Sequence, residues 1–113
     1  MDLSVTVATA GSNKVVYVKG ELDVYTTATF TGQVLSLIDG GSYHLVVDME
    51  GTDFVDSQGL NALVEMLKKV RAHNGYLVVV CTQERILKVF RITGLTKVFK
   101  IYSSLDEVLA VLP

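Results

Sequence analysis

Residues 43–70 read YHLVVDMEGTDFVDSQGLNALVEMLKKV, and the spacing of apolar side chains changes within this stretch. Residues 43–48 are a short run rich in β-branched side chains, typical of a strand buried on both faces of a parallel sheet. After Asp56-Ser57 the apolar residues follow the i, i+3, i+4, i+7 spacing of an amphipathic helix. Asn74-Gly75 predicts the end of this helix, with the glycine as its C-terminal cap. The helical apolar positions are Leu60, Leu63, Val64, Leu67 and Val70.

The sequence before this stretch predicts a hairpin and a helix. Residues 3–9 alternate apolar and polar side chains, and residues 15–18 resume the alternation after turn residues 11–13, which favours two antiparallel strands. Beyond residues 20–23 the apolar spacing becomes helical, so we expect a first helix over residues 25–38.

The sequence after this stretch predicts four more elements. Residues 76–81 form another buried strand, and Thr82 can cap a short helix that Thr93-Gly94 ends. Residues 98–102 predict a final strand, and Ser103-Ser104 caps a closing helix. The order is β-β-α-β-α-β-α-β-α, which predicts an α/β sandwich with a mixed sheet, an antiparallel opening hairpin and about four α-helices.

Composition limits the function classes. The chain has 113 residues, 50% of them hydrophobic, so residues 1–113 are expected to form a single domain. A net charge of −2 gives no general attraction to nucleic acid, and no apolar run reaches the roughly 20 residues that a membrane span needs. The start, Met1-Asp2-Leu3-Ser4, has no basic export region, and Cys81 is the only cysteine, so a cytoplasmic location is expected.

No catalytic or metal signature is present. Phosphate-loop, dinucleotide-binding, metalloprotease and hydrolase motifs are absent, which argues against an enzyme and against a bound cofactor. His44 and His73 lack a third ligand at metal-site spacing, and neither is placed to act as a base for Ser57. We therefore assign no catalytic residue and no metal ligand.

Ser57 has two interpretations. Asp56 or Ser57 is a standard helix N-cap, a role that opens most helices. On a helical wheel of about 100° per residue, however, Ser57 stands beside the core stripe, and Asn61, Val64 and Lys68 lie within about 40° of it. This flank has the mixed chemistry of a partner-binding surface, although a merely solvated face has the same composition.

A phosphoryl group on Ser57 would change binding more than folding. It would add a charge of about −1.5 to −2 at a helix N-terminus, where free amides and the helix dipole accept an anion. A partner shaped for a neutral hydroxyl would meet a dianion beside Asp56, with Asp53 and Asp23 in the neighbourhood.

The segment Phe54-Val55-Asp56-Ser57-Gln58-Gly59-Leu60 resembles the start of the second helix in the STAS domain of anti-sigma factor antagonists. Residues 20–23, Gly-Glu-Leu-Asp, followed by the Thr-Ala-rich residues 26–28, are similar to the turn after the second strand of that family. Residues 92–95 with Phe99 and Ile101 also fit, so the resemblance spans nearly the whole chain.

The resemblance implies a phosphorylation switch without a cofactor. An anti-sigma factor with serine kinase activity would bind the unmodified chain, release its sigma factor and phosphorylate Ser57, and a serine phosphatase would reverse the modification. Asp23 and Asp56 match the acidic residues beside the phosphosite, and Gln58 and Gly59 are its neighbours on the other side. Gln58 replaces the small residue usual in the family, and an added Asp53 carboxylate stands nearby, which affects partner choice. We expect a monomer or weak dimer.

Two alternatives remain. The chain could be a scaffold STAS subunit of a stress-signalling or lipid-transport assembly that is not regulated by phosphorylation. It could also be a small-ligand or nucleotide-binding module, or an enzyme with Ser57 as nucleophile, but it lacks a phosphate loop and a base.

Overall fold

In the computed structural model, which describes residues 2–113, the chain opens with the expected antiparallel hairpin. Its strands are β1 (Leu3–Ala10) and β2 (Asn13–Leu22), so the second strand is longer than the alternating run 15–18. Gly20 adopts φ +101°, and an added Cβ would lie 2.1 Å from the Asp2 carbonyl oxygen. The strand therefore continues through a site that only glycine can occupy.

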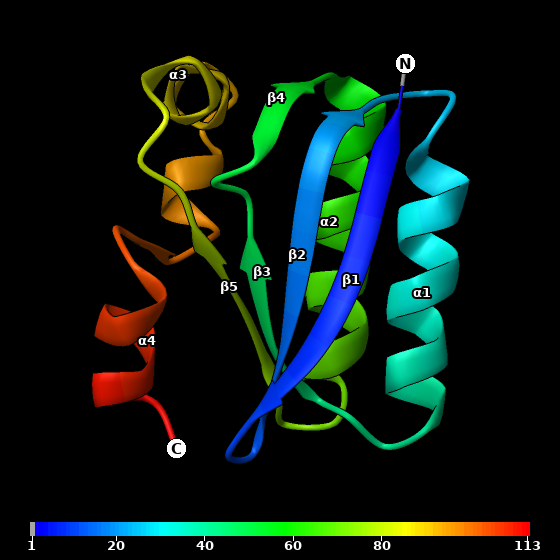
Figure 1. Cartoon of the computed structure of the whole chain (residues 1–113), viewed down its shortest axis with the longest axis vertical. Helices are drawn as coiled ribbons and strands as arrows, with labels where there is room; N and C mark the ends of the chain where they lie inside the picture. The colour runs from blue at the N-terminus through cyan, green and yellow to red at the C-terminus, as the bar shows by residue number, and fades with distance from the viewer. Residues whose placement is uncertain (1) are drawn as a thin grey trace.

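The sheet is mixed, because every pairing after the hairpin is parallel (Figure 1). Its strand order is β1-β2-β3-β5-β6. The short strand β4 is not part of this order and pairs with the end of β2. The remaining strands are β3 (His44–Asp48), β4 (Thr52–Val55), β5 (Tyr76–Val80) and β6 (Ile101–Tyr102).

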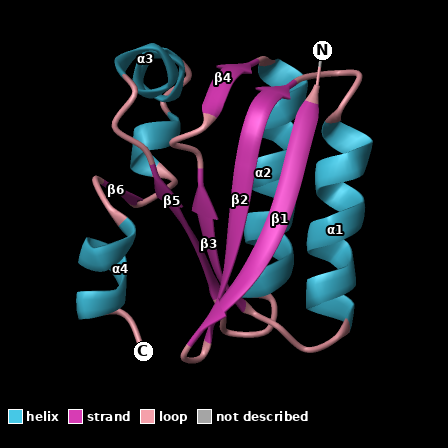
Figure 2. Cartoon of the chain, viewed as in Figure 1, coloured by secondary structure: helices cyan, strands magenta, loops and turns pink. Residues whose placement is uncertain are grey.

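Helices cover the two faces of the sheet unequally (Figure 2). The helices are α1 (Thr27–Asp39), α2 (Ser57–Arg71), α3 (Glu84–Ile92), the short 3-10 helix η1 (Leu95–Lys97) and α4 (Leu105–Val111). The main core contains buried side chains of α1, α2 and α3 with alternate residues of the strands, for example Phe30, Leu63 and Val47. A smaller core lies on the other sheet face, where Val108 of α4 meets Val46 and Val78. No helix within the described part of the chain is long and apolar enough to cross a membrane.

The predicted fold class is confirmed, and the structure adds one strand to the predicted order. The predicted order has no strand between the strand 43–48 and the helix after Asp56-Ser57, but Thr52–Val55 form β4, whose Thr52 hydroxyl donates a 2.8 Å hydrogen bond to the Val18 carbonyl oxygen. The burial pattern of β4 is buried at both ends and exposed in the middle, so it does not alternate as a half-buried strand should.

The predicted strand over residues 98–102 is wrong in its first half. Gly94 adopts a left-handed conformation, and the Phe99 amide donates to the Leu95 carbonyl oxygen, so the chain coils through η1. Phe99 is buried against Phe90 in an edge-to-face contact, with ring centroids 5.8 Å apart. Only Ile101–Tyr102 pair with β5.

Three helix ends also differ from the prediction. α1 begins at Thr27 and not at residue 25. Ala72 is the C-cap of α2, and Gly75 is instead required by the close approach of Tyr43, whose carbonyl oxygen would lie 2.0 Å from an added Cβ. Gln83 is the N-cap residue of α3, while the Thr82 hydroxyl donates to Glu50.

Candidate functional site

The first turn of α2 begins at Ser57, and Asp56 is its N-terminal cap. The Asp56 Oδ1 atom accepts a 2.9 Å hydrogen bond from the Gly59 amide, and the Asp56 carbonyl oxygen accepts a 3.0 Å bond from the Leu60 amide. A helix leaves its first amides without helical partners, so the Ser57 and Gln58 amides are the ones that an added anion can use. Of the two candidate caps in the sequence, Asp56 performs the capping.

Ser57 is therefore not needed to hold the helix end. Its side chain is exposed, and its hydroxyl has no hydrogen-bond partner among residues 2–113. Gln58 beside it is also exposed. The hydroxyl stands at the positive end of the α2 dipole, open to a modifying enzyme or a docking protein.

Asp23 organises the loop between β2 and α1. It is 6% exposed, and its Oδ1 atom accepts hydrogen bonds from the Tyr25 amide (2.9 Å) and the Thr26 amide (3.1 Å). The Thr26 hydroxyl in turn donates to the Glu21 carbonyl oxygen at 2.7 Å. The carboxylate of Asp23 is thus bound within its own loop, which is a structural role beside the site.

A hydrogen bond joins this loop to the start of α2. The Val24 amide donates to Asp56 Oδ2 at 3.1 Å, and the Asp56 amide donates to the Leu22 carbonyl oxygen at 3.2 Å. The two oxygens of Asp56 therefore bind two different elements. The predicted neighbours Asp23 and Asp56 are brought together by these loops, although their carboxylates have separate partners.

Gly59 allows α2 to approach the end of β2. An added Cβ would lie 2.4 Å from the Leu22 carbonyl oxygen and 2.8 Å from the Val55 Cγ2 atom. Because one of these neighbours is backbone, the contact cannot be relieved by a side-chain rotation. Gly59 thus positions the first turn of the helix and does not itself offer a surface.

The predicted partner-binding flank lies on the outer side of α2. Asn61 and Lys68 are exposed and Val64 is half-buried, while Leu63 and Leu67 are in the core, as the helical wheel predicts. At 1.5 Å per residue, Lys68 lies about 16 Å from Ser57 along the axis, so it does not reach a phosphate there. The exposure of the flank agrees with the prediction, and its binding role stays a prediction.

Three exposed apolar side chains near Ser57 were missed by the sequence analysis. Tyr25 is 83% exposed, Val24 is 56% exposed, and Phe54 of β4 is 46% exposed. Val24 is bonded through its amide to the residue before Ser57, and Phe54 precedes Ser57 by three residues. The sequence signal was Asp23, whose side chain favours a turn by accepting hydrogen bonds from amides two and three residues on, so that Val24 and Tyr25 lie in a loop before α1.

Neither histidine is placed beside Ser57. The His44 ring stacks on Tyr76 and the His73 ring stacks on Tyr43, with centroids 4.7 Å and 4.1 Å apart, so both rings are engaged away from Ser57. Within residues 2–113, no three His, Cys, Asp or Glu side chains gather as a metal site would require. The arrangement presents a hydroxyl, free helix amides and an apolar surround, which suits recognition by another protein and the acceptance of a phosphate.

Comparison with known proteins identifies the family of the chain. The family model of the STAS domain matches residues 4–108. The anti-sigma-B factor antagonist of Staphylococcus aureus (strain NCTC 8325 / PS 47) is 32% identical over 95 residues, which cover 84% of this chain and 88% of the relative.

Two solved structures share the fold. An anti-sigma factor antagonist from Mycobacterium paratuberculosis is 27% identical, with a TM-score of 0.88 and coverage of 96% of this chain and 92% of that chain. The phosphorylated form of the Bacillus cell fate determinant SpoIIAA is 18% identical, with a TM-score of 0.74 and coverage of 96% and 100%.

Proposed function

This chain belongs to the STAS domain family of anti-sigma factor antagonists, and we propose that its binding to an anti-sigma factor is switched off by phosphorylation of Ser57. The observation that carries the proposal is the exposed Ser57 hydroxyl at the N-terminus of α2, where Asp56 and not Ser57 caps the helix. The unmodified chain binds the anti-sigma factor and so releases a sigma factor.

The unmodified surface suits a protein partner. The exposed Tyr25, Val24 and Phe54 provide apolar area beside a neutral hydroxyl, and aromatic side chains of this kind often dominate interface energies. The outer side of α2, with Asn61 and Val64, extends this surface along the helix. The partner therefore covers both the loop after β2 and the first turns of α2.

Phosphorylation changes the charge of this surface without disturbing the fold. The free amides of Ser57 and Gln58 and the helix dipole stabilise the phosphate. Asp56 keeps its two hydrogen bonds, because its oxygens face the Gly59 and Val24 amides. A partner that docks on the neutral hydroxyl then meets a dianion next to the Asp56 carboxylate, so repulsion and desolvation oppose binding.

The chain is the substrate of the switch and not an enzyme in it. A serine kinase activity of the anti-sigma factor transfers the phosphoryl group to the Ser57 oxygen from its own ATP, and a serine phosphatase removes it. SpoIIAA, which shares the fold of this chain, has been solved in a phosphorylated form, so a phosphate is compatible with this fold. We place this cycle in the cytoplasm, with a chain that is a monomer or weak dimer and needs no cofactor.

Mass spectrometry tests the proposal directly. The full chain is incubated with the anti-sigma kinase of its own organism and ATP, and the phosphate is mapped. Modification is expected at Ser57, and it should be lost in Ser57→Ala but kept in Ser36→Ala, which changes an exposed serine of α1. Efficient phosphorylation of the Ser57→Ala variant would contradict the assignment.

A scaffold role in a stress-signalling or lipid-transport assembly is the second candidate, favoured by the exposed apolar side chains of Val24, Tyr25 and Phe54. Size-exclusion chromatography with light scattering distinguishes the two roles. A complex with the anti-sigma factor that dissociates on addition of ATP supports the switch, and a complex whose size is unaffected by phosphorylation supports the scaffold.

A further inference from the structure

A cavity of about 520 Å³ lies between α3, η1 and the carboxyl ends of β5 and β6. Its wall is largely apolar, with Leu87 from α3, Phe99 after η1 and Ile101 from β6. This volume lies within the range of roughly 300–1,000 Å³ that small-molecule sites occupy. The cavity also lies outside the carboxyl ends of parallel strands, where open α/β sheets bind their ligands.

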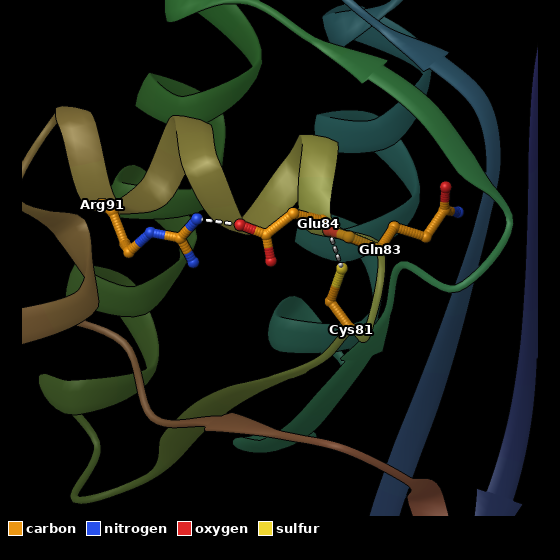
Figure 3. Close-up of polar contacts among 4 residues, drawn as sticks. All are labelled: Cys81, Gln83, Glu84 and Arg91. Atoms are coloured by element: carbon orange, nitrogen blue, oxygen red, sulfur yellow. Dashed lines mark hydrogen bonds and ion pairs between the residues drawn. The ribbon is translucent and has the colours of Figure 1, made fainter.

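The cavity has one cationic side chain at its rim. Arg91 lines the cavity from α3, and its side chain is half exposed. Its guanidinium donates a hydrogen bond to the carboxylate of Glu84, on the same helix (Figure 3). An ion pair with both partners exposed contributes little stability, so a ligand anion can displace Glu84 from Arg91. Arginine binds carboxylates in a two-pronged geometry, which gives such a ligand a fixed orientation.

Among the described residues that line the cavity, Arg91 alone is charged, and carboxylates lie just behind the wall. Cys81 is 3% exposed, and burial, with the nearby Glu50 and Asp48 charges, raises the pKa of its thiol, which favours the neutral thiol. The Thr82 hydroxyl is bound to Glu50, and the Ser103 hydroxyl to Glu107. Arg91 is thus the group that selects the charge of a ligand.

The charge of the surrounding segment points the same way. Residues 84–100 hold five of the ten Lys and Arg residues of the chain but one of its twelve Asp and Glu residues. The five cations, all exposed, are Arg85, Lys88, Arg91, Lys97 and Lys100. Of these five cations Arg91 lines the cavity, and the other four can act on a bound anion only at longer range.

We propose that this cavity binds a small amphipathic anion, with the apolar body of the ligand against Leu87, Phe99 and Ile101 and its carboxylate on Arg91. The inference is independent of the Ser57 switch, since none of these residues belongs to the surface around Ser57. It adds a ligand site to a chain whose family role is protein binding.

Octanoate, titrated into the full chain and followed by amide chemical shifts, is the probe. We expect saturable shifts centred on Leu87, Phe99 and Ile101, and binding about tenfold tighter than that of 1-octanol, which lacks the charge. Arg91→Gln should weaken octanoate binding by about tenfold, because a charge-assisted hydrogen bond is lost. Arg85→Gln, which removes an exposed cation of α3 outside the cavity wall, should leave it unchanged.

Several results would overturn the proposal. These are the absence of saturable shifts, equal weakening by Arg85→Gln and Arg91→Gln, and equal affinity for octanoate and 1-octanol. Adsorption to phosphatidylglycerol vesicles without binding of monomeric octanoate would show that the basic segment docks on a lipid surface instead. An unchanged spectrum of each free variant outside the mutated helix confirms that the comparison concerns binding.

Discussion

Gly59 shows how a single residue fixes the candidate site. Its missing side chain lets the first turn of α2 approach the Leu22 carbonyl oxygen, and this approach brings the Asp56 carboxylate within reach of the Val24 amide. The position of Ser57 relative to the loop after β2 depends on the same contact. A glycine at this place in the helix therefore has a packing reason, and not only a conformational one.

The variant Gly59→Ala should destabilise the protein by about 1–3 kcal/mol, the usual range for an overpacked core site. The matched control is Gly32→Ala in α1, where nothing lies within 4 Å of an added Cβ. There alanine should stabilise by about 0.5–1 kcal/mol, since glycine in a helix interior costs that much. Urea unfolding measures both, and a Gly59→Ala variant as stable as the wild type would contradict the close approach.

Cys81 predicts a pH dependence of stability. Burial raises the pKa of its thiol above the ordinary value of 9.0, so the folded state keeps the proton at a pH where the unfolded state releases it. The contribution is complete below pH 9.0 and is lost as the pH rises through the higher folded value. Urea unfolding on both sides of pH 9.0 should show a steeper loss of stability for wild type than for Cys81→Ala. Parallel profiles of the two proteins would show that the thiol is not desolvated.

At the scale of elements, the loop between β2 and α1 exposes two apolar side chains, Val24 and Tyr25, that a partner can bind. Asp23 and Thr26 hold its backbone by short hydrogen bonds, which leaves Val24 and Tyr25 directed away from the core. A rigid loop that carries an exposed aromatic side chain loses little conformational entropy when a partner covers it. We therefore expect this loop to contribute much of the affinity for the anti-sigma factor.

Tyr25→Ala should weaken the complex with the anti-sigma factor by about tenfold or more, the loss typical of an aromatic hot spot. Its own stability should change by no more than about 0.5 kcal/mol, because Tyr25 is 83% exposed. Val111→Ala, which truncates a 64% exposed apolar residue on α4, is the control and should leave the affinity unchanged. Calorimetric titration gives these values, and equal affinities for both variants would remove Tyr25 from the interface.

The sequence predicts elements whose hydrophobic period is strong and misses those set by tertiary contacts. The α2 pattern predicts most of the buried stripe, including Leu63 and Leu67, but not the burial of Ala62 and Met66. β4 carries no such period, since it is buried at both ends and exposed in the middle, and a register shift at Gly20/Glu21 interrupts its pairing with β2. The run 98–102 is apolar and aromatic apart from Lys100, which favours a strand, yet burial of Phe99 against Phe90 redirects its first half.

In the candidate site, too, residues in a sequence motif are predictable and residues placed by tertiary contacts are not. Asp56, Ser57 and Gly59 are recognisable from their motif, and the structure assigns capping to the first and close packing to the last. Tyr25 could not be placed from its own residue type, since a hydrogen bond across 32 residues, from the Val24 amide to Asp56, brings its loop to α2. A contact between residues so far apart in the sequence forms only when the sheet is assembled.

At the scale of the whole molecule, two candidate binding regions share no residue. One is the surface around Ser57, where exposed apolar side chains lie beside the Asp56 carboxylate, and the other is the cavity near Arg91 in the basic segment 84–100. A phosphate on Ser57 adds charge to the first region alone. The fold should therefore stay intact while the binding surface changes its electrostatics.

The dissociation constant of the complex with the anti-sigma factor, compared between the unmodified chain and the chain phosphorylated at Ser57, tests this switch most directly. Repulsion of several kcal/mol between like charges predicts that phosphorylation weakens binding by about a hundredfold or more, with Tm nearly unchanged. Ser36→Asp, which adds charge on α1, should bind as wild type does. Equal dissociation constants for the two forms would contradict the switch at Ser57.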